Sequence, residues 1–196
     1  MQTIVSDREF FAFCEANPDL RLERTSRGEI VIVPPAGGES DFECLEIAAE
    51  VRAWAMKMRR GAVFGTSAAF LLPDGSALSP DVAWVSKERL AQLSRAQRRQ
   101  FLQVIPEFIV EVMSPSDRLA DARQKMQNWM ANGVELGWLI DGDARTVWVY
   151  RNGHEPLQVS GAGTLAGEGP LDGFLLPLND FWDGLTRLVE EGPASE

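Results

Sequence analysis

The segment Glu107–Met113 limits the fold more than any other part of the chain. It is an apolar run of strand length, but it carries an acid, Glu111, near its carboxyl end. Successive residues of a strand face opposite sides, so Glu111 shares a face with Ile109 and Met113. An ionised carboxylate on a buried face is costly unless a cation or a hydrogen-bond donor meets it. The chain must therefore bury this strand and also provide Glu111 with a partner.

The helix predicted directly after this strand offers such a partner. Ser116 can cap a helix that runs from about residue 117 to 132, and Gly133 is expected to stop it. Lys125 lies on the flank of its apolar stripe, so its stem can follow apolar surface while its ammonium reaches toward the sheet. Because a helix that follows a strand packs back on the same sheet, Lys125 and Glu111 can meet.

A second acid, Asp81, follows Pro80 at the start of the predicted strand Val82–Val85. Two acids at the ends of neighbouring strands can share a hard divalent cation such as Mg²⁺, which prefers oxygen ligands. Each residue also has an ordinary structural interpretation when it is taken alone. Asp81 suits a turn or a cap, Glu111 an ion pair, and Lys125 an exposed surface. Their convergence is therefore the observation that a structure must supply.

Other predicted elements surround this strand–helix unit. Hairpins are expected over residues 21–33 and 136–150, and helices over 88–103 and near 179–189. Strands around one central strand–helix unit indicate an α/β (α+β) domain with a mixed sheet. The length of 196 residues predicts a single domain over residues 1–189, with residues 190–196 as a loose tail.

A long helix is predicted between Ser40 and Gly61. Ser40 and Glu43 have the spacing of a capping box, which marks a helix start. The residues expected on its apolar side are Leu45, Ile47, Ala48, Val51, Trp54, Ala55 and Met58.

Composition excludes several classes of protein. His154 is the only histidine and Cys14 and Cys44 are the only cysteines, so histidine-rich and four-cysteine metal sites are ruled out. The net charge of −10 argues against a uniformly basic nucleic-acid coat, although residues 50–125 hold 12 basic and 8 acidic residues. The sequence has no apolar run of membrane-spanning length and no signal peptide, so we expect a cytoplasmic protein without a membrane partner.

Several segments together resemble the Uma-type restriction endonuclease family, and the resemblance spans about residues 5–183. The segments are residues 79–85 (SPDVAWV), 106–117 (PEFIVEVMSPSD), 125–126 (KM), 133–141 (GVELGWLID) and 171–174 (LDGF). This family belongs to the PD-(D/E)XK nuclease superfamily. The resemblance therefore implies a restriction-endonuclease-like fold, in which helices flank a mixed β-sheet.

The resemblance also implies roles for individual residues. Asp81 matches the PD element and Glu111 the D/E element, while Lys125 matches a lysine that has moved to the following helix. Met113 stands where the lysine of the superfamily motif would be. Glu46 resembles an extra helical acid, so the implied ligands of Mg²⁺ or Mn²⁺ are Asp81, Glu111 and Glu46.

Two departures from the family pattern bear on activity. Cys44 stands where members often carry His or Asn, and Gly65 stands where an acid is expected. Both leave the Asp81, Glu111 and Lys125 set intact but affect the expected substrate contacts.

The implied function is a metal-dependent endonuclease that hydrolyses phosphodiester bonds, with DNA as its substrate and a homodimer as one possible assembly. The metal would activate water, and Lys125 would orient or deprotonate that water or stabilise developing charge. Basic residues that include Lys57, Arg60 and Lys87 are candidates for phosphate contacts. A non-catalytic DNA-binding or protein-interaction module remains an alternative. A serine hydrolase is a weaker one, since the chain has no G-x-S-x-G elbow.

Overall fold

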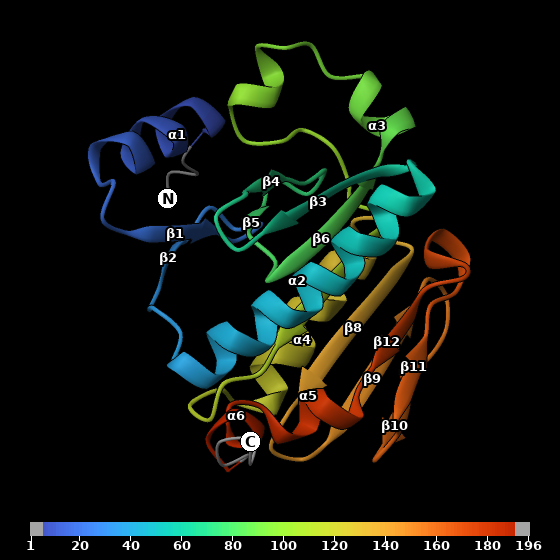
Figure 1. The fold of residues 1–196 in the computed structure, drawn as a ribbon. Coiled ribbons are helices and arrows are strands. Elements are labelled where there is room, and N and C mark those ends of the chain that lie inside the picture. Colours follow the sequence, from blue (N-terminus) through green and yellow to red (C-terminus); the bar gives the residue numbers. More distant parts are fainter. Residues whose placement is uncertain (1–5, 191–196) are drawn as a thin grey trace, which may run out of the picture.

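A six-stranded mixed β-sheet runs through the centre of the computed structural model, which describes residues 6–190 (Figure 1). Its strands, in spatial order, are β10 (Leu157–Ser160), β9 (Thr146–Arg151), β8 (Leu136–Asp141), β7 (Phe108–Val112), β6 (Val82–Ser86) and β3 (Gly61–Gly65). Neighbouring strands are antiparallel except β7 and β8, which are parallel. The mixed sheet with helices on its faces confirms the predicted fold class.

The strand–helix unit around Glu111 forms as predicted. A parallel pair needs a crossover connection, and α4 (Leu119–Ala131) supplies it between β7 and β8. The helix begins two residues after the predicted start, with Arg118 as its N-cap. The shift arises because the Asp117 carboxylate accepts a hydrogen bond from the Ser114 amide at 2.8 Å, which closes a turn before the helix.

The two faces of the sheet pack against different helices (Figure 1). On one face, α2 (Gly38–Met58) packs with β11 (Thr164–Ala166), β12 (Leu175–Pro177) and α5 (Asn179–Asp183). On the other face, α4 packs through Met126 and Trp129. Val110 and Val112 contact the α2 side and Ile109 the α4 side, so alternation turns Glu111 toward α4.

A second, smaller sheet lies beside the start of β6. Its strands, in spatial order, are β2 (Ile30–Val33), β1 (Arg21–Arg24), β5 (Ala77–Leu78) and β4 (Phe70–Leu71). Helix α1 (Asp7–Ala16) packs on β1. Because only Ser79, Pro80 and Asp81 separate β5 from β6, this sheet lies directly next to Asp81.

Three predicted helices differ from the structure. Helix α2 begins at Gly38 with Gly37 as its cap, so Ser40 and Glu43 lie inside the helix and are buried rather than forming a capping box. Segment 88–103 lacks an apolar stripe and holds only two short pieces, α3 (Lys87–Ala91) and the 3-10 helix Gln97–Arg99.

The third difference lies at the carboxyl end. Gly184, with φ of 51°, divides the predicted final helix into α5 and α6 (Thr186–Glu190), because a positive φ, which glycine adopts readily, interrupts the helical backbone. A further 3-10 turn spans Gly169–Leu171. Apart from Glu190, the predicted tail lies outside the described residues. No helix within residues 6–190 has the length and apolar character needed to cross a membrane.

Candidate active site

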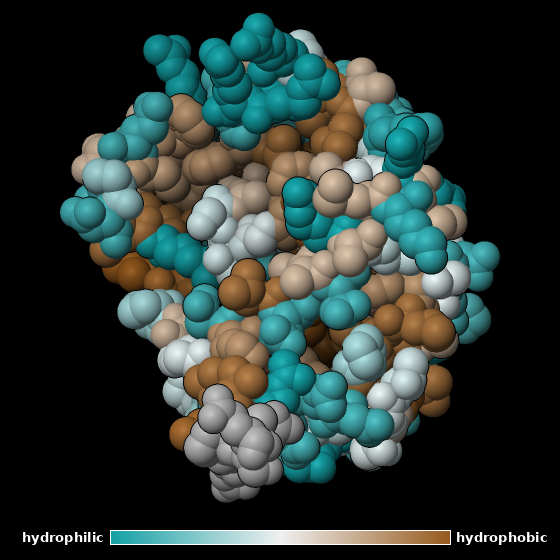
Figure 2. Space-filling view, in the orientation of Figure 1, coloured by the Kyte–Doolittle hydropathy of each residue, from teal (hydrophilic) through white to brown (hydrophobic). Residues whose placement is uncertain are grey.

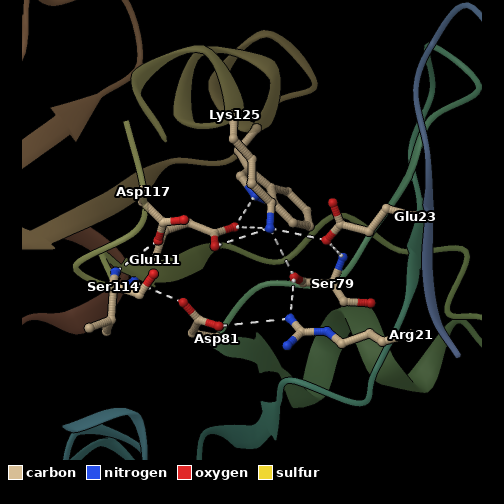
Figure 3. Close-up of polar contacts among 10 residues, drawn as sticks. Arg21, Glu23, Ser79, Asp81, Glu111, Ser114, Asp117 and Lys125 are labelled. Atoms are coloured by element: carbon tan, nitrogen blue, oxygen red, sulfur yellow. Dashed lines mark hydrogen bonds and ion pairs between the residues drawn. The ribbon is translucent and has the colours of Figure 1, made fainter. Parts of the chain in front are cut away.

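The Lys125 ammonium lies at the centre of a buried polar cluster (Figure 3). Its Nζ is 3.1 Å from the Glu111 carboxylate, 3.0 Å from Oε1 of Glu23 and 3.2 Å from the carbonyl oxygen of Ser79. An ammonium has three N–H donors, and each of these three partners can take one. The structure thus brings Lys125 to Glu111 as the sequence predicts, and it adds a second acid, Glu23.

Asp81 joins the cluster because β6 and β7 are paired. The register aligns Val82 with Val110, which places Asp81 beside the carboxyl end of β7. The Val112 amide donates to Oδ2 of Asp81 at 2.8 Å, while Nη2 of Arg21 lies 3.8 Å from Oδ1. Burial raises the pKa of Asp81 above its ordinary value, although the Val112 amide and the nearby cations oppose this.

Glu111 is 7% exposed and accepts a hydrogen bond from the Trp129 indole at 2.8 Å. Burial raises the pKa of this carboxyl group; Lys125 opposes the rise, and the nearby acids Asp81 and Glu23 add to it. Burial alone would lower the pKa of Lys125, but the carboxylates of Glu111, Glu23 and Asp81 outweigh it and raise that pKa. The ammonium therefore stays protonated at neutral pH.

A cavity of about 650 Å³ opens onto these side chains. Asp81, Glu111 and Lys125 line it, and β1, the β2–α2 connection and the β7–α4 loop form its walls. Arg118, at the start of α4, is exposed at this cavity. The cavity can therefore admit a substrate group to the buried acids.

Other predicted contacts lie elsewhere. Glu46 forms an ion pair with Arg187, with Oε2 and Nη2 2.9 Å apart, and it does not line the cavity. Lys87 directly follows the last residue of β6, and its amide donates a hydrogen bond to the Arg60 carbonyl. Asp81 lies at the other end of β6, directly before its first residue. These candidate phosphate contacts therefore lie at the opposite end of β6 from the cluster. Hydrophilic side chains do gather over the α3–β7 segment at the top of Figure 2.

Sequence reasoning missed three contributors to the cluster: Arg21, Glu23 and Trp129. The sequence predicts Trp129 as a core residue, and it is fully buried, but its indole N–H also donates a hydrogen bond to Glu111. Arg21 and Glu23 alternate in a predicted hairpin strand, which places them on one face. This alternation predicts that Arg21 and Glu23 face the same neighbouring segment. It does not identify that segment, which contains Ser79 and lies more than fifty residues away in the sequence.

The donor set fits a hard divalent cation. Asp81 and Glu111 offer carboxylate oxygens, and Oδ1 of Asp81 lies 3.8 Å from the Arg21 guanidinium. Within the described part of the chain, no three His, Cys, Asp or Glu side chains form a ready ligand group. Mg²⁺ is commonly held by one or two carboxylates, with water and substrate phosphate filling the remaining positions. The two acids are therefore sufficient for that kind of site.

Comparisons with known proteins bear on the fold and the family of the chain. None of the curated proteins compared with the chain matches it. The crystal structure of a putative nuclease belonging to DUF820 from Anabaena variabilis aligns with a TM-score of 0.75 and 20% identity. The alignment covers 90% of this chain and 96% of that one, so the two proteins share a fold.

A cryo-electron microscopy structure of a DrdV–DNA complex aligns with a TM-score of 0.36 and 16% identity, over 58% of this chain and 9% of that one. The model of the Uma2 family, described as "Putative restriction endonuclease", matches residues 7–179. This range includes every strand from β1 to β12 and every residue of the cluster. The chain therefore belongs to the Uma2 family of restriction-endonuclease-like proteins.

Proposed function

We propose that the protein is a metal-dependent endonuclease that hydrolyses phosphodiester bonds in DNA. Asp81, Glu111 and Lys125 are its catalytic residues, and Asp81 and Glu111 hold Mg²⁺ or Mn²⁺. The observation that carries the proposal is that these three residues, far apart in the sequence, converge at one cavity. Glu46 is left out of the proposed site because its carboxylate pairs with Arg187 away from that cavity.

The chemistry follows from the charge of each group. A bound divalent cation would polarise the phosphate and make a water molecule more acidic. The surrounding carboxylates raise the pKa of Lys125 and so favour its protonated form, in which it stabilises negative charge on the phosphate or donates to the attacking water. The exposed Arg118 at the cavity can contact a flanking phosphate. Reaction at this site needs only acids, an amine and a metal, which suits a chain with one histidine.

Cleavage of supercoiled plasmid and single-stranded DNA in Mg²⁺ or Mn²⁺ tests the proposal. Asp81→Asn, Glu111→Gln and Lys125→Ala should each abolish cleavage while circular dichroism shows a folded protein. Glu50→Gln is the matched control, because Glu50 is an exposed acid on α2 outside the cluster. Variants that cut as fast as the wild type would assign any observed cleavage to another site.

Removal of the metal is a separate test. A chelator should stop cleavage but leave the melting temperature nearly unchanged, because the proposed ligands lie on strands that pair without the ion. A large fall in melting temperature would contradict a catalytic ion and indicate a structural one.

Cleavage of both DNA strands would suit a homodimer that carries two cavities. Sedimentation analysis with and without a duplex oligonucleotide would test this part of the proposal. A monomer in both conditions would contradict it.

A further inference from the structure

Glu23 enters the cluster from a different part of the fold than the other acids. It lies on β1 of the smaller sheet and is only 7% exposed. Its Oε1 accepts from the Ser79 amide at 3.0 Å and lies 3.0 Å from Nζ of Lys125. Figure 3 shows its carboxylate directed at Lys125 from the side opposite Glu111. One oxygen atom of Glu23 thus bridges Lys125 and the segment that leads into Asp81.

The ammonium of Lys125 is fixed by contacts in three directions. Glu111 reaches it from β7, Glu23 from β1 and the Ser79 carbonyl from the β5–β6 connection. A lysine side chain has many rotamers and loses considerable entropy when it is held in one of them. With Glu23 removed, one N–H of the ammonium would lose its partner and the stem could move within the cavity.

The needs of folding alone do not account for this third acid. The Glu111–Lys125 pair already balances one buried charge with another. Adding the Glu23 carboxylate makes the cluster more negative, and buried charge without a matching partner is costly. Glu23 also disfavours the ionised forms of Asp81 and Glu111 by like-charge repulsion. Local costs of this kind are typical of functional sites.

We propose that Glu23 is a positioning residue for cleavage: it fixes the Lys125 ammonium relative to the Ser79–Asp81 segment. This inference rests on the proposed nuclease function. It extends the active site to the smaller sheet, so docking of the β1–β2 hairpin on the central sheet completes the arrangement around the phosphate. Glu23 lines the same cavity, but the role assigned to it acts through the Lys125 ammonium.

Single-turnover cleavage of plasmid DNA tests the inference. Glu23→Gln should lower the maximal rate on the order of 10- to 100-fold, the scale expected when a reacting group is displaced by about 1 Å. The affinity for DNA, measured by fluorescence anisotropy in Ca²⁺, should stay the same. Glu23→Asp keeps the charge and should recover part of the rate. Glu29→Gln is the matched control, because it makes the same change at an exposed position of the same hairpin.

A measurement that does not need cleavage follows the ammonium directly. The chain has three lysines, and Lys57 and Lys87 are exposed, so the Lys125 ammonium, which is only partly exposed and is held by two carboxylates, should give its own signal in a ¹H–¹⁵N spectrum of side-chain amines. In Glu23→Gln this signal should shift and exchange faster with water. In Glu29→Gln it should not change.

The outcomes separate the two proposals. Wild-type protein that never cuts DNA would overturn the nuclease function and this inference with it. If wild-type protein cuts but Glu23→Gln cuts equally fast, the inference alone fails. It also fails alone if the Lys125 signal is the same in Glu23→Gln as in the wild type.

Discussion

Two of the places in the described structure that bury carboxylates differ in the partners that they provide. At the Lys125 cluster, Glu23 and Glu111 are each 7% exposed and both contact the ammonium. At the start of α2, Glu43 is 8% exposed, but within residues 6–190 it has no hydrogen-bond or ion-pair partner. Burial and three neighbouring acids raise the pKa of Glu43 to about 7. Those acids are Glu39, Asp143 and Asp141.

The difference shows that burial alone does not mark a functional acid. Glu43 packs against Gly142, where a Cβ atom would overlap its carboxyl group. Because its pKa is raised, Glu43 can stay protonated, and therefore uncharged, at a higher pH than an ordinary glutamate. The Lys125 cluster instead supplies cations and N–H donors to its acids. Donors and cations mark a candidate site only where the buried acid also lines a cavity, since Glu107 is buried and paired with Arg89 but does not line the cavity at Lys125.

The Trp129 indole provides the sharpest test of these donors. Trp129→Phe removes the 2.8 Å hydrogen bond to Glu111 and should lower the free energy of unfolding by about 1.5–3 kcal/mol beyond the packing loss, because the acceptor is charged and buried. Urea denaturation measures this loss. Trp138→Phe is the control, since Trp138 is fully buried and its indole N–H has no hydrogen-bond partner among residues 6–190. Equal losses in the two variants would mean that the donor contributes nothing.

For Glu43 we expect a substitution to raise the free energy of unfolding, whereas Trp129→Phe is expected to lower it. The folded state favours protonated Glu43, because the pKa there is about 7 against an ordinary 4.5. The wild type should therefore lose stability as pH rises from about 5 to 8, and Glu43→Gln should not lose this part. We expect Glu43→Gln to be about 1–2 kcal/mol more stable than wild type at pH 8, after allowance for screening at the partly exposed rim.

Thermal melts of both proteins at pH 5 and pH 8 check the Glu43 prediction. Glu50→Gln, an exposed change on the same helix, should show no pH-dependent gain. A stability difference between Glu43→Gln and wild type that is the same at both pH values would show that the pKa of Glu43 is not raised in the folded protein.

The cations of the cluster can be tested at Arg21. Its guanidinium lowers the pKa of Asp81, so Arg21→Gln should make Asp81 harder to ionise. DNA cleavage should fall roughly 2- to 5-fold at neutral pH, since the two groups are 3.8 Å apart and Arg21 is partly exposed. The loss should be larger in acid and smaller in alkali, as a pH–rate profile would show. Arg27→Gln in the exposed hairpin turn is the control; a pH-independent loss would argue against the effect on Asp81.

The part of the site on the central sheet could be predicted from the sequence. Alternation in β7 fixed the face of Glu111, and the helix that follows had to pack on that face, so Lys125 came within reach. The place of Asp81 beside Glu111 follows if β6 and β7 are neighbours in the sheet. These are local rules that act over short stretches of chain, and they also gave the mixed sheet.

Two parts of the site could not be predicted from such rules. Glu23 meets Lys125 only because the smaller sheet docks beside β6, and no local pattern specifies that docking. On α2, the predicted apolar side included Leu45, which is 66% exposed. Near the start of α2, two polar residues, Ser40 and Glu43, face the core instead. The apolar stripe in the sequence therefore predicts the wrong buried face for this part of the helix.

The orientation of α2 about its own axis leads to the prediction with the smallest expected effect. It turns Glu43 inward and leaves Glu46 at the surface, where Glu46 pairs with Arg187. A partly exposed pair contributes about 0–1 kcal/mol, so Glu46→Gln should reduce the free energy of unfolding by no more than that and leave DNA cleavage unchanged. Arg187→Gln should cause a similar small loss of stability. If Glu46→Gln instead abolished cleavage as Asp81→Asn is expected to do, a helical acid would belong to the metal site, and partners seen around a buried acid would no longer identify the functional ones.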